Sequence, residues 1–146
     1  MKSEPQDTGD ESYNCTNIWI SFLIGHQLQT VRRILTDLRF DVYVCDRLID
    51  EIRDVASRDK IRKRITANDI KDLLAIIQAF CKFAVIKAEV NPSIIRDPKD
   101  LYLLELAQTI GADYIVSGDI DLTIIGQHHN TRVLKLADFK AMMLLG

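Results

Sequence analysis

The sequence predicts an α/β fold, a three-layer α/β/α sandwich built on a parallel β-sheet. Short, continuously apolar segments alternate with longer segments in which apolar residues recur at helical spacing. Strands that are apolar on both faces are typical of parallel sheets covered by helices on each side. The chain has 146 residues, which suits one domain with its own hydrophobic core.

The first residues do not fit this pattern. Residues 1–14 are polar, acidic and almost free of aliphatic side chains. Such a composition cannot bury enough apolar surface to offset the entropy of ordering the chain. We therefore expect a disordered or aberrant N-terminal tail over 1–14 and a folded domain over 15–146.

Within that domain, strands and helices are expected to alternate. Asn68 is the expected N-cap of one helix, Pro98 a first-turn residue of the next, and Gly111 its C-terminal stop. An apolar stretch over 18–38 precedes the first clear strand and has helical spacing. The expected strands are 41–45, 84–86, 114–117 and 132–134, and the further helices are 46–57, 68–80, 98–110, 122–125 and 137–145.

Composition and charge exclude several classes of protein. The net charge is −2, so any contact with nucleic acid must come from a local patch. No apolar run reaches the roughly 18–20 residues of a membrane span, and the first residues lack the apolar stretch of a secretion signal. We therefore expect no membrane association and a cytoplasmic location. Three widely spaced cysteines argue against a disulfide framework or a zinc site.

Acids that follow predicted strands are the first candidates for a functional site, because α/β sheets bind ligands beyond the carboxyl ends of their strands. Asp119 follows the strand 114–117 through Gly118, where the backbone can turn sharply, and Asp121 comes two residues later. Either acid could simply cap the short helix that follows. Two acids around one turn, beside Ser117, favour a site for a hard cation.

Two acids on predicted helices join them. Glu51 lies on the flank of the apolar stripe of its helix, whereas Asp50 points away from it. A plain surface glutamate is an equally good interpretation of that pattern. Asp100 lies in the first turn of its helix on the core-facing side, while Glu105 faces the opposite way. Its alternative role is that of a partner for the helix dipole.

Clustered carboxylates need a compensating charge. Two carboxylates at 4 Å repel by roughly 4 kcal/mol at an effective dielectric of 20. A group of three or four is therefore sustained by a bound cation or by raised pKa values. Oxygen ligands without paired histidine or cysteine favour Mg²⁺ or Mn²⁺ over zinc.

Several segments resemble one known family. Arg96–Asp100, Gly111–Leu122 and Arg132–Leu134 closely resemble the C-terminal half of PIN-domain proteins, in particular those that are toxins of toxin–antitoxin pairs. Thr16–Ser21 resembles the segment just after the first catalytic aspartate of that family. The resemblance spans Cys15 to Phe139. It implies a type II toxin that hydrolyses single-stranded RNA with Mg²⁺ or Mn²⁺, a cognate antitoxin as its partner, and it allows a homodimer.

The resemblance also implies roles for individual residues. Asn17 and Ser117 match polar residues that support the site, and their plain interpretations are a helix cap and a strand-end hydroxyl. The resemblance assigns the roles of the family's second, third and fourth acids, which are catalytic and bind the metal, to Glu51, Asp100 and Asp119. It assigns the role of an accessory metal ligand to Asp121.

The chain departs from the family at its start. Where the family has a short aliphatic strand ending in Asp-Thr-Asn, residues 12–17 read Ser-Tyr-Asn-Cys-Thr-Asn. Cys15 therefore takes the place of the first acid, and we expect the first strand to be missing or degenerate. The alternative function is then a catalytically impaired PIN domain that acts only through partner binding. A phospho-receiver domain fits less well, because its acidic pair lies near the first strand.

Two further features are left without a role. His26, His128 and His129 have no metal-binding spacing, and a polar loop is the simplest interpretation of the adjacent pair. The dense basic run Arg58–Arg64 either touches RNA phosphates or is a solvated linker, and the sequence does not identify the residues that bind nucleic acid.

Overall fold

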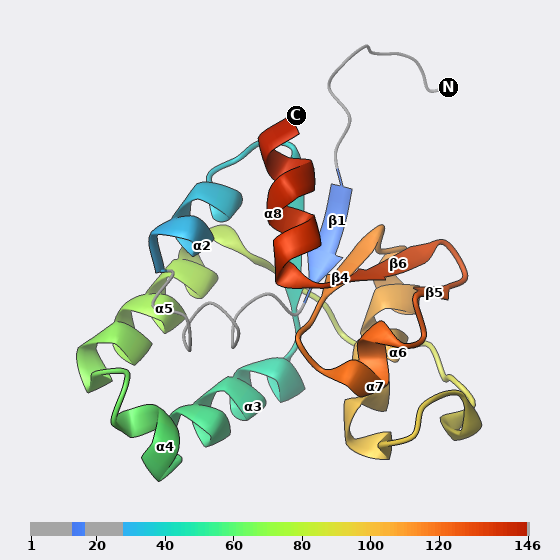
Figure 1. Ribbon diagram of the computed structural model, residues 1–146, viewed down its shortest axis with the longest axis horizontal. Helices are drawn as coiled ribbons and strands as arrows, with labels where there is room; N and C mark the ends of the chain where they lie inside the picture. The colour runs from blue at the N-terminus through green and yellow to red at the C-terminus, as the bar shows by residue number, and fades with distance from the viewer. Residues whose placement is uncertain (1–12, 17–27, 146) are drawn as a thin grey trace.

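The fold is given by a computed structural model, in which the described residues are 13–16 and 28–145 (Figure 1). In this part of the chain, six strands form one sheet in the order β3-β2-β1-β4-β6-β5. Neighbouring strands run parallel, except for the antiparallel pair of β5 and β6 at one edge. The predicted parallel α/β fold is confirmed. The strands are β1 (Tyr13–Thr16), β2 (Phe40–Val44), β3 (Lys82–Phe83), β4 (Tyr114–Val116), β5 (Gln127–His128) and β6 (Thr131–Leu134).

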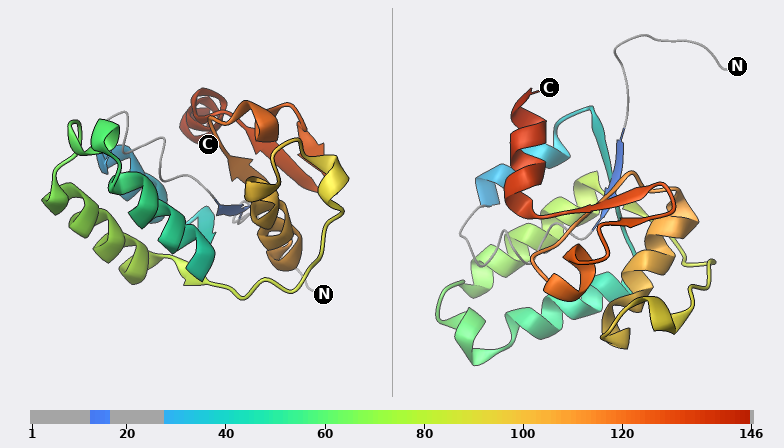
Figure 2. Two further views of the ribbon diagram at one scale, coloured as in Figure 1. Left: turned by 90° about the horizontal axis from the view of Figure 1, so that it is seen from below. Right: turned by 45° about the vertical axis from the view of Figure 1, so that its right-hand side comes forward.

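Helices cover both faces of this sheet, and α6 and α8 lie on opposite sides of β1 and β4 (Figure 2). The helices are α2 (Leu28–Leu35), α3 (Asp46–Ala56), α4 (Asp59–Arg62), α5 (Ala67–Phe80), α6 (Leu101–Ile110), α7 (Ile120–Thr123) and α8 (Leu136–Leu145). Two 3-10 turns, Pro92–Ile94 and Pro98–Asp100, precede α6. Over the described ranges, none of the helices has the length and apolar character that crossing a membrane requires.

An aromatic cluster joins α8 to the sheet. The Phe139 ring of α8 lies 5.2 Å from the Phe40 ring of β2 and 6.4 Å from the Tyr114 ring of β4, between centroids. The Tyr13 ring of β1 lies 6.0 Å from Phe40 and 5.6 Å from Tyr114. Aromatic pairs at such separations attract each other beyond the effect of burial alone. The cluster therefore fixes the C-terminal helix over the three central strands.

Strand β1 corrects the expectation that the first strand is missing or degenerate. Tyr13–Thr16 lies in the middle of the sheet, where Cys15 pairs with Val42 of β2 and with Tyr114 of β4. Cys15 and Thr16 are fully buried. The strand thus includes Tyr13 and Asn14, from the end of the expected tail. Residues 1–12 lie outside the described residues, so the remainder of the tail stays a prediction.

Polar anchors hold β1 where aliphatic side chains were expected to do so. The backbone N–H of Asn14 donates to Oδ2 of Asp113 at 2.9 Å, and the N–H of Asp113 donates to the carbonyl of Asn14 at 2.9 Å. On the other side, the hydroxyl of Thr16 donates to the carbonyl of Tyr43 at 2.9 Å. These bonds fix the register of β1 against both neighbours, a task that apolar patterning performs in most strands.

Several other boundaries differ from the expectation. Helix α5 begins after Thr66, whose side chain and that of Asp69 form a reciprocal capping box, so Asn68 is not the N-cap. The strand expected at 84–86 is found at Lys82–Phe83. Helix α4 and strand β5 were not predicted. Pro98 begins a 3-10 turn ahead of α6, and Gly111 ends α6 in the left-handed conformation, as expected of a C-terminal glycine.

We predict that Cys15→Asp destabilises the fold by roughly 3 kcal/mol or more, because it buries a carboxylate without a partner. The nearby charges of Asp113 and Asp41 already add to burial in raising the pKa of the Cys15 thiol. Urea unfolding at about pH 7 measures the effect, with Cys15→Ala as the uncharged control. The penalty should shrink towards pH 4, where the new carboxyl is protonated. A Cys15→Asp variant as stable as Cys15→Ala at neutral pH would contradict the prediction.

Candidate functional site

Three of the four predicted metal-binding acids come together at the carboxyl edge of the sheet. Asp119 follows β4, Asp100 ends the 3-10 turn before α6, and Glu51 lies on α3, the helix that follows β2. Asp100 can share a hydrogen bond with Asp119, and its carboxyl group also experiences the charge of Glu51. The fold therefore assembles at one edge acids that are far apart in the sequence.

Asp100 is the most unusual of these acids. Its residue is only 5% exposed, and no donor reaches its buried Oδ2. Burial, followed by the hydrogen bond with Asp119 and the charges of Asp119 and Glu51, raises the pKa of Asp100 from 3.8 to about 7. A proton or a cation at Oδ2 would satisfy this orphaned oxygen.

Asp119 is the ionised partner of that pair. The hydrogen bond from protonated Asp100 is the main cause that lowers the pKa of Asp119, with help from the backbone N–H of Asp121 and the charges of Lys99 and Arg96. Asp100 and Asp119 therefore titrate as a pair, in which the pKa of Asp100 is raised and that of Asp119 is lowered.

The loop around Asp119 is fixed by its own backbone. Asp119 is the N-cap of α7, and its Oδ1 accepts the N–H of Asp121 at 2.9 Å. The N–H of Asp119 in turn donates to the hydroxyl of buried Ser117 at 3.0 Å. The helix-cap interpretation of Asp119 is thus confirmed, and Ser117 has the contact that a supporting residue would make.

Asp121 is directed to a different partner. Its Oδ1 lies 2.9 Å from Nη2 of Arg96 in an ion pair, and its side chain is 13% exposed. The structure therefore places Asp121 beside the acids but pairs it with an arginine. Its role as an accessory metal ligand stays a prediction.

Glu51 is held by a tyrosine that sequence reasoning missed. The hydroxyl of Tyr102 donates to Oε1 of Glu51 at 2.8 Å, and Tyr102 is only 3% exposed. Burial, and next the charge of Glu51, raises the pKa of Tyr102, so the phenol stays protonated as a donor. Asp50 is exposed, as its helical position predicted. The available sequence signal was a tyrosine two residues after Asp100 within the aliphatic run of α6.

Cys15 does not lie among these acids. The carboxylates that act on its thiol are Asp113 and Asp41, at the start of β4 and in the first half of β2. Burial raises the thiol pKa well above its usual range, so a thiolate ligand is unavailable at neutral pH. Asn17, the other residue predicted near the first acid, lies outside the described residues.

The ligand atoms of the candidate site suit a hard cation, but the spacing of the acids suits one less well. Glu51, Asp100 and Asp119 supply carboxylate oxygens, the ligands that Mg²⁺ and Mn²⁺ prefer, and Oδ2 of Asp100 is buried without a partner. However, over residues 13–16 and 28–145 no group of three or more histidine, cysteine or acidic side chains is arranged to hold a metal ion. The described geometry is thus that of an acidic cluster in which Oδ2 of Asp100 is buried without a donor.

Comparison with known proteins agrees with this arrangement. Neither the curated proteins nor the solved structures gave a match. The sequence model of a family described as a PIN domain matches residues 16–121, well over half of the chain and including Glu51, Asp100 and Asp119. Together with the mostly parallel sheet and its acidic edge, this match means that the chain belongs to the PIN-domain family.

Proposed function

We propose that this protein is an endoribonuclease that hydrolyses phosphodiester bonds of single-stranded RNA with Mg²⁺ or Mn²⁺. The observation that carries the proposal is the pair formed by the buried carboxyl of Asp100 and the half-buried carboxyl of Asp119, with Glu51 beside it, at the carboxyl edge of the sheet. PIN domains generally are nucleases and depend on divalent metals. A structural role explains such a pair poorly, because burying like charges destabilises the fold unless a proton or a cation compensates them.

In this mechanism Asp100, Asp119 and Glu51 hold the cation. When bound, a divalent cation activates water and neutralises the charge that develops on the phosphodiester. Tyr102 orients the Glu51 carboxylate through its hydroxyl, and Ser117 fixes the loop that carries Asp119. Burial raises the pKa of Asp100 to about 7, so near neutral pH a cation would compete with a proton for this carboxylate.

The biological setting is part of the proposal. The segments around Asp100 and Asp119 resemble those of toxins, so we propose a toxin of a type II pair, active in the cytoplasm on RNA and restrained by a cognate antitoxin. Growth arrest on induction of the intact gene, absent from the Asp119→Asn variant and relieved by the neighbouring gene, would support this role.

The second candidate is a PIN domain without catalysis that acts only through a partner. Two observations favour it: Cys15 brings no carboxylate to the acidic edge, and the apolar side chains of Phe80, Phe83 and Val85 are more than half exposed near edge strand β3. Exposed apolar side chains close together often mark protein interfaces. RNA cleavage by the purified chain separates the two candidates.

We predict that Glu51→Gln lowers Mn²⁺ affinity and magnesium-dependent cleavage of a single-stranded RNA by roughly tenfold or more, the scale of losses at metal sites. Asp50→Asn is the matched control on the same helix and should leave both within about twofold, since Asp50 is exposed. Mn²⁺ relaxation titration and a gel assay measure the two effects, and EDTA should stop cleavage. Equal losses in both variants would refute the role of Glu51. A chain that binds Mn²⁺ but leaves RNA intact would favour the second candidate.

We also predict that the metal-free protein loses stability as pH rises from about 4 to 7. The pKa of Asp100 is raised on folding, so the proton favours the folded state, and this contribution disappears as the carboxyl ionises. A rise from 3.8 to about 7 corresponds to at most about 4 kcal/mol. In urea unfolding at several pH values with EDTA, Asp100→Asn should remove most of this slope and Asp50→Asn should not. The prediction fails if Asp100→Asn keeps the full slope.

A further inference from the structure

We propose that Arg47, Lys99 and Arg96 form a phosphate-binding rim beside the acids, where the backbone phosphates of RNA on either side of the cleaved bond bind. This inference rests on the proposed function and names the residues that hold its substrate. It also excludes the dense basic run Arg58–Arg64 from contact with the phosphates next to the reacting bond.

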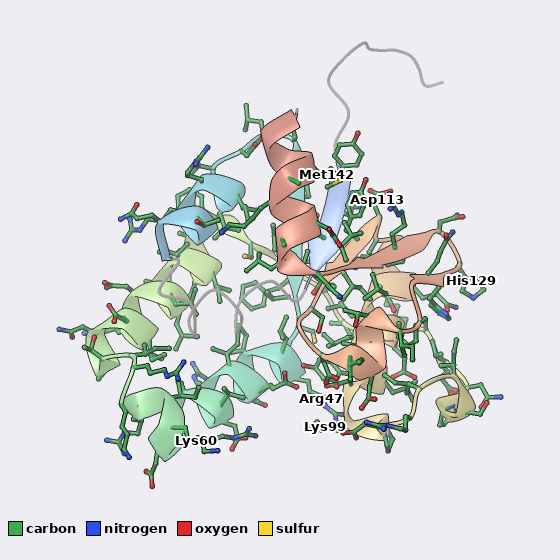
Figure 3. The ribbon with its side chains drawn as sticks, in the orientation of Figure 1. Arg47, Lys60, Lys99, Asp113, His129 and Met142 are labelled. Carbon is green, nitrogen blue, oxygen red and sulfur yellow. The ribbon has the colours of Figure 1, made fainter. Side chains whose placement is uncertain are left out.

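Arg47 and Lys99 are brought together across the site. Arg47 lies in the first turn of α3, and its Nη2 donates to the carbonyl of Lys99 at 3.4 Å. Its Cζ lies 4.7 Å above the ring of Tyr102, the tyrosine that holds Glu51. Figure 3 shows Arg47 and Lys99 next to each other, with Lys60 on α4 well apart. An arginine that contacts a carbonyl and an aromatic face keeps further donors on its planar guanidinium, which suits bidentate contact with phosphate.

The charges of the rim act on the acidic pair. Lys99 opposes the rise of the Asp100 pKa, and Lys99 and Arg96 both help to lower the Asp119 pKa. Nevertheless, the side chains of Arg96 and Lys99 remain 81% and 67% exposed. These cations therefore stand close enough to act on the acids while their charged groups still face the solvent from which RNA arrives.

Neutralising the acids is the simpler explanation of these cations, but it does not account for Arg47. The guanidinium of Arg47 contacts a carbonyl and an aromatic ring, and neither of these cancels its charge. The Arg96 side chain stays 81% exposed in its ion pair with Asp121, so it can contact a phosphate from the solvent side without leaving the carboxylate. A chain with net charge −2 needs such a local patch if its acidic edge is to receive a polyanion.

The basic run is in the wrong place for this task. It begins after the C-terminal end of α3, whereas Arg47 lies at the other end of this helix of 11 residues. At 1.5 Å per residue the two ends are roughly 15 Å apart. Arg58, the first residue of the run, is also paired with Asp54 at 3.1 Å. Figures 1 and 2 agree that α4 lies at the far end of α3 from α6.

The test compares two double variants of equal charge change: Arg47→Gln with Lys99→Gln, and Arg62→Gln with Lys63→Gln in the basic run. Binding of a labelled single-stranded oligoribonucleotide is measured by fluorescence anisotropy with EDTA, from about 50 to 300 mM salt. Each lost phosphate contact reduces the slope of log affinity against log salt by about 0.7 on a single strand. We expect a reduction of about 1.4 and a roughly tenfold weaker affinity for the rim variant, and no change of slope for the control.

A charge-preserving variant, Arg47→Lys with Lys99→Arg, should keep the slope of the unaltered protein, and melting curves confirm that each variant folds. Equal slopes for the rim variant and the unaltered protein, a larger effect in the basic-run variant, or no RNA binding at all would overturn the proposal. Because binding is measured without metal, the outcome is independent of catalysis. If the protein cleaves RNA but the rim variant has an unchanged salt slope, the phosphate-binding rim is refuted and the nuclease function is not. If the rim variant has a reduced salt slope but the protein does not cleave RNA, the nuclease function is refuted and the rim is supported.

Discussion

The pairing of the Asp100 carboxyl with that of Asp119 is the constraint on which the candidate site depends. Burial and the contact with Asp119 raise the pKa of Asp100, while the hydrogen bond from Asp100 lowers the pKa of Asp119, so the two groups resist ionising together without a cation. No hydrogen-bond donor contacts Oδ2 of Asp100. An oxygen kept buried and unsatisfied in this way is better suited to receive a ligand than to stabilise the fold.

The position of that pair depends in turn on the central strand. Strand β1 connects β2, which leads into α3 and Glu51, with β4, which leads into the Asp119 loop. Because β1 lacks aliphatic residues, its place depends on backbone pairing with both neighbours, on the aromatic contacts of Tyr13, and on the polar bonds of Asn14 and Thr16. The two halves of the acidic edge are thus held together by this strand, and a substitution at Cys15 is expected to disturb the sheet before it disturbs the site.

The sequence predicts those parts of the fold and the site that depend on the local pattern of residues. Asp119 was predicted because a continuous apolar strand ends just before it, and Glu51 because its helical position differs from that of Asp50. Strand β1 was missed because hydrogen bonds to Asp113, 99 residues away, do the work of an apolar pattern. The Tyr102 contact with Glu51 and the Arg47 contact with Lys99 span 51 and 52 residues. No periodicity encodes such pairs, which appear only when the parallel sheet brings its strand ends to one edge.

The charges at that edge balance in a way that couples metal and substrate. The acids Glu51, Asp100 and Asp119 lie beside the cations of Arg47, Lys99 and Arg96, of which Lys99 is also paired with Asp97 and Arg96 with Asp121. A divalent cation that displaces the Asp100 proton adds two positive charges and removes one, which leaves the edge more positive by one unit. If the protein has the proposed function, binding of the cation would therefore strengthen the attraction of this edge for the RNA backbone, next to the bond that is cleaved.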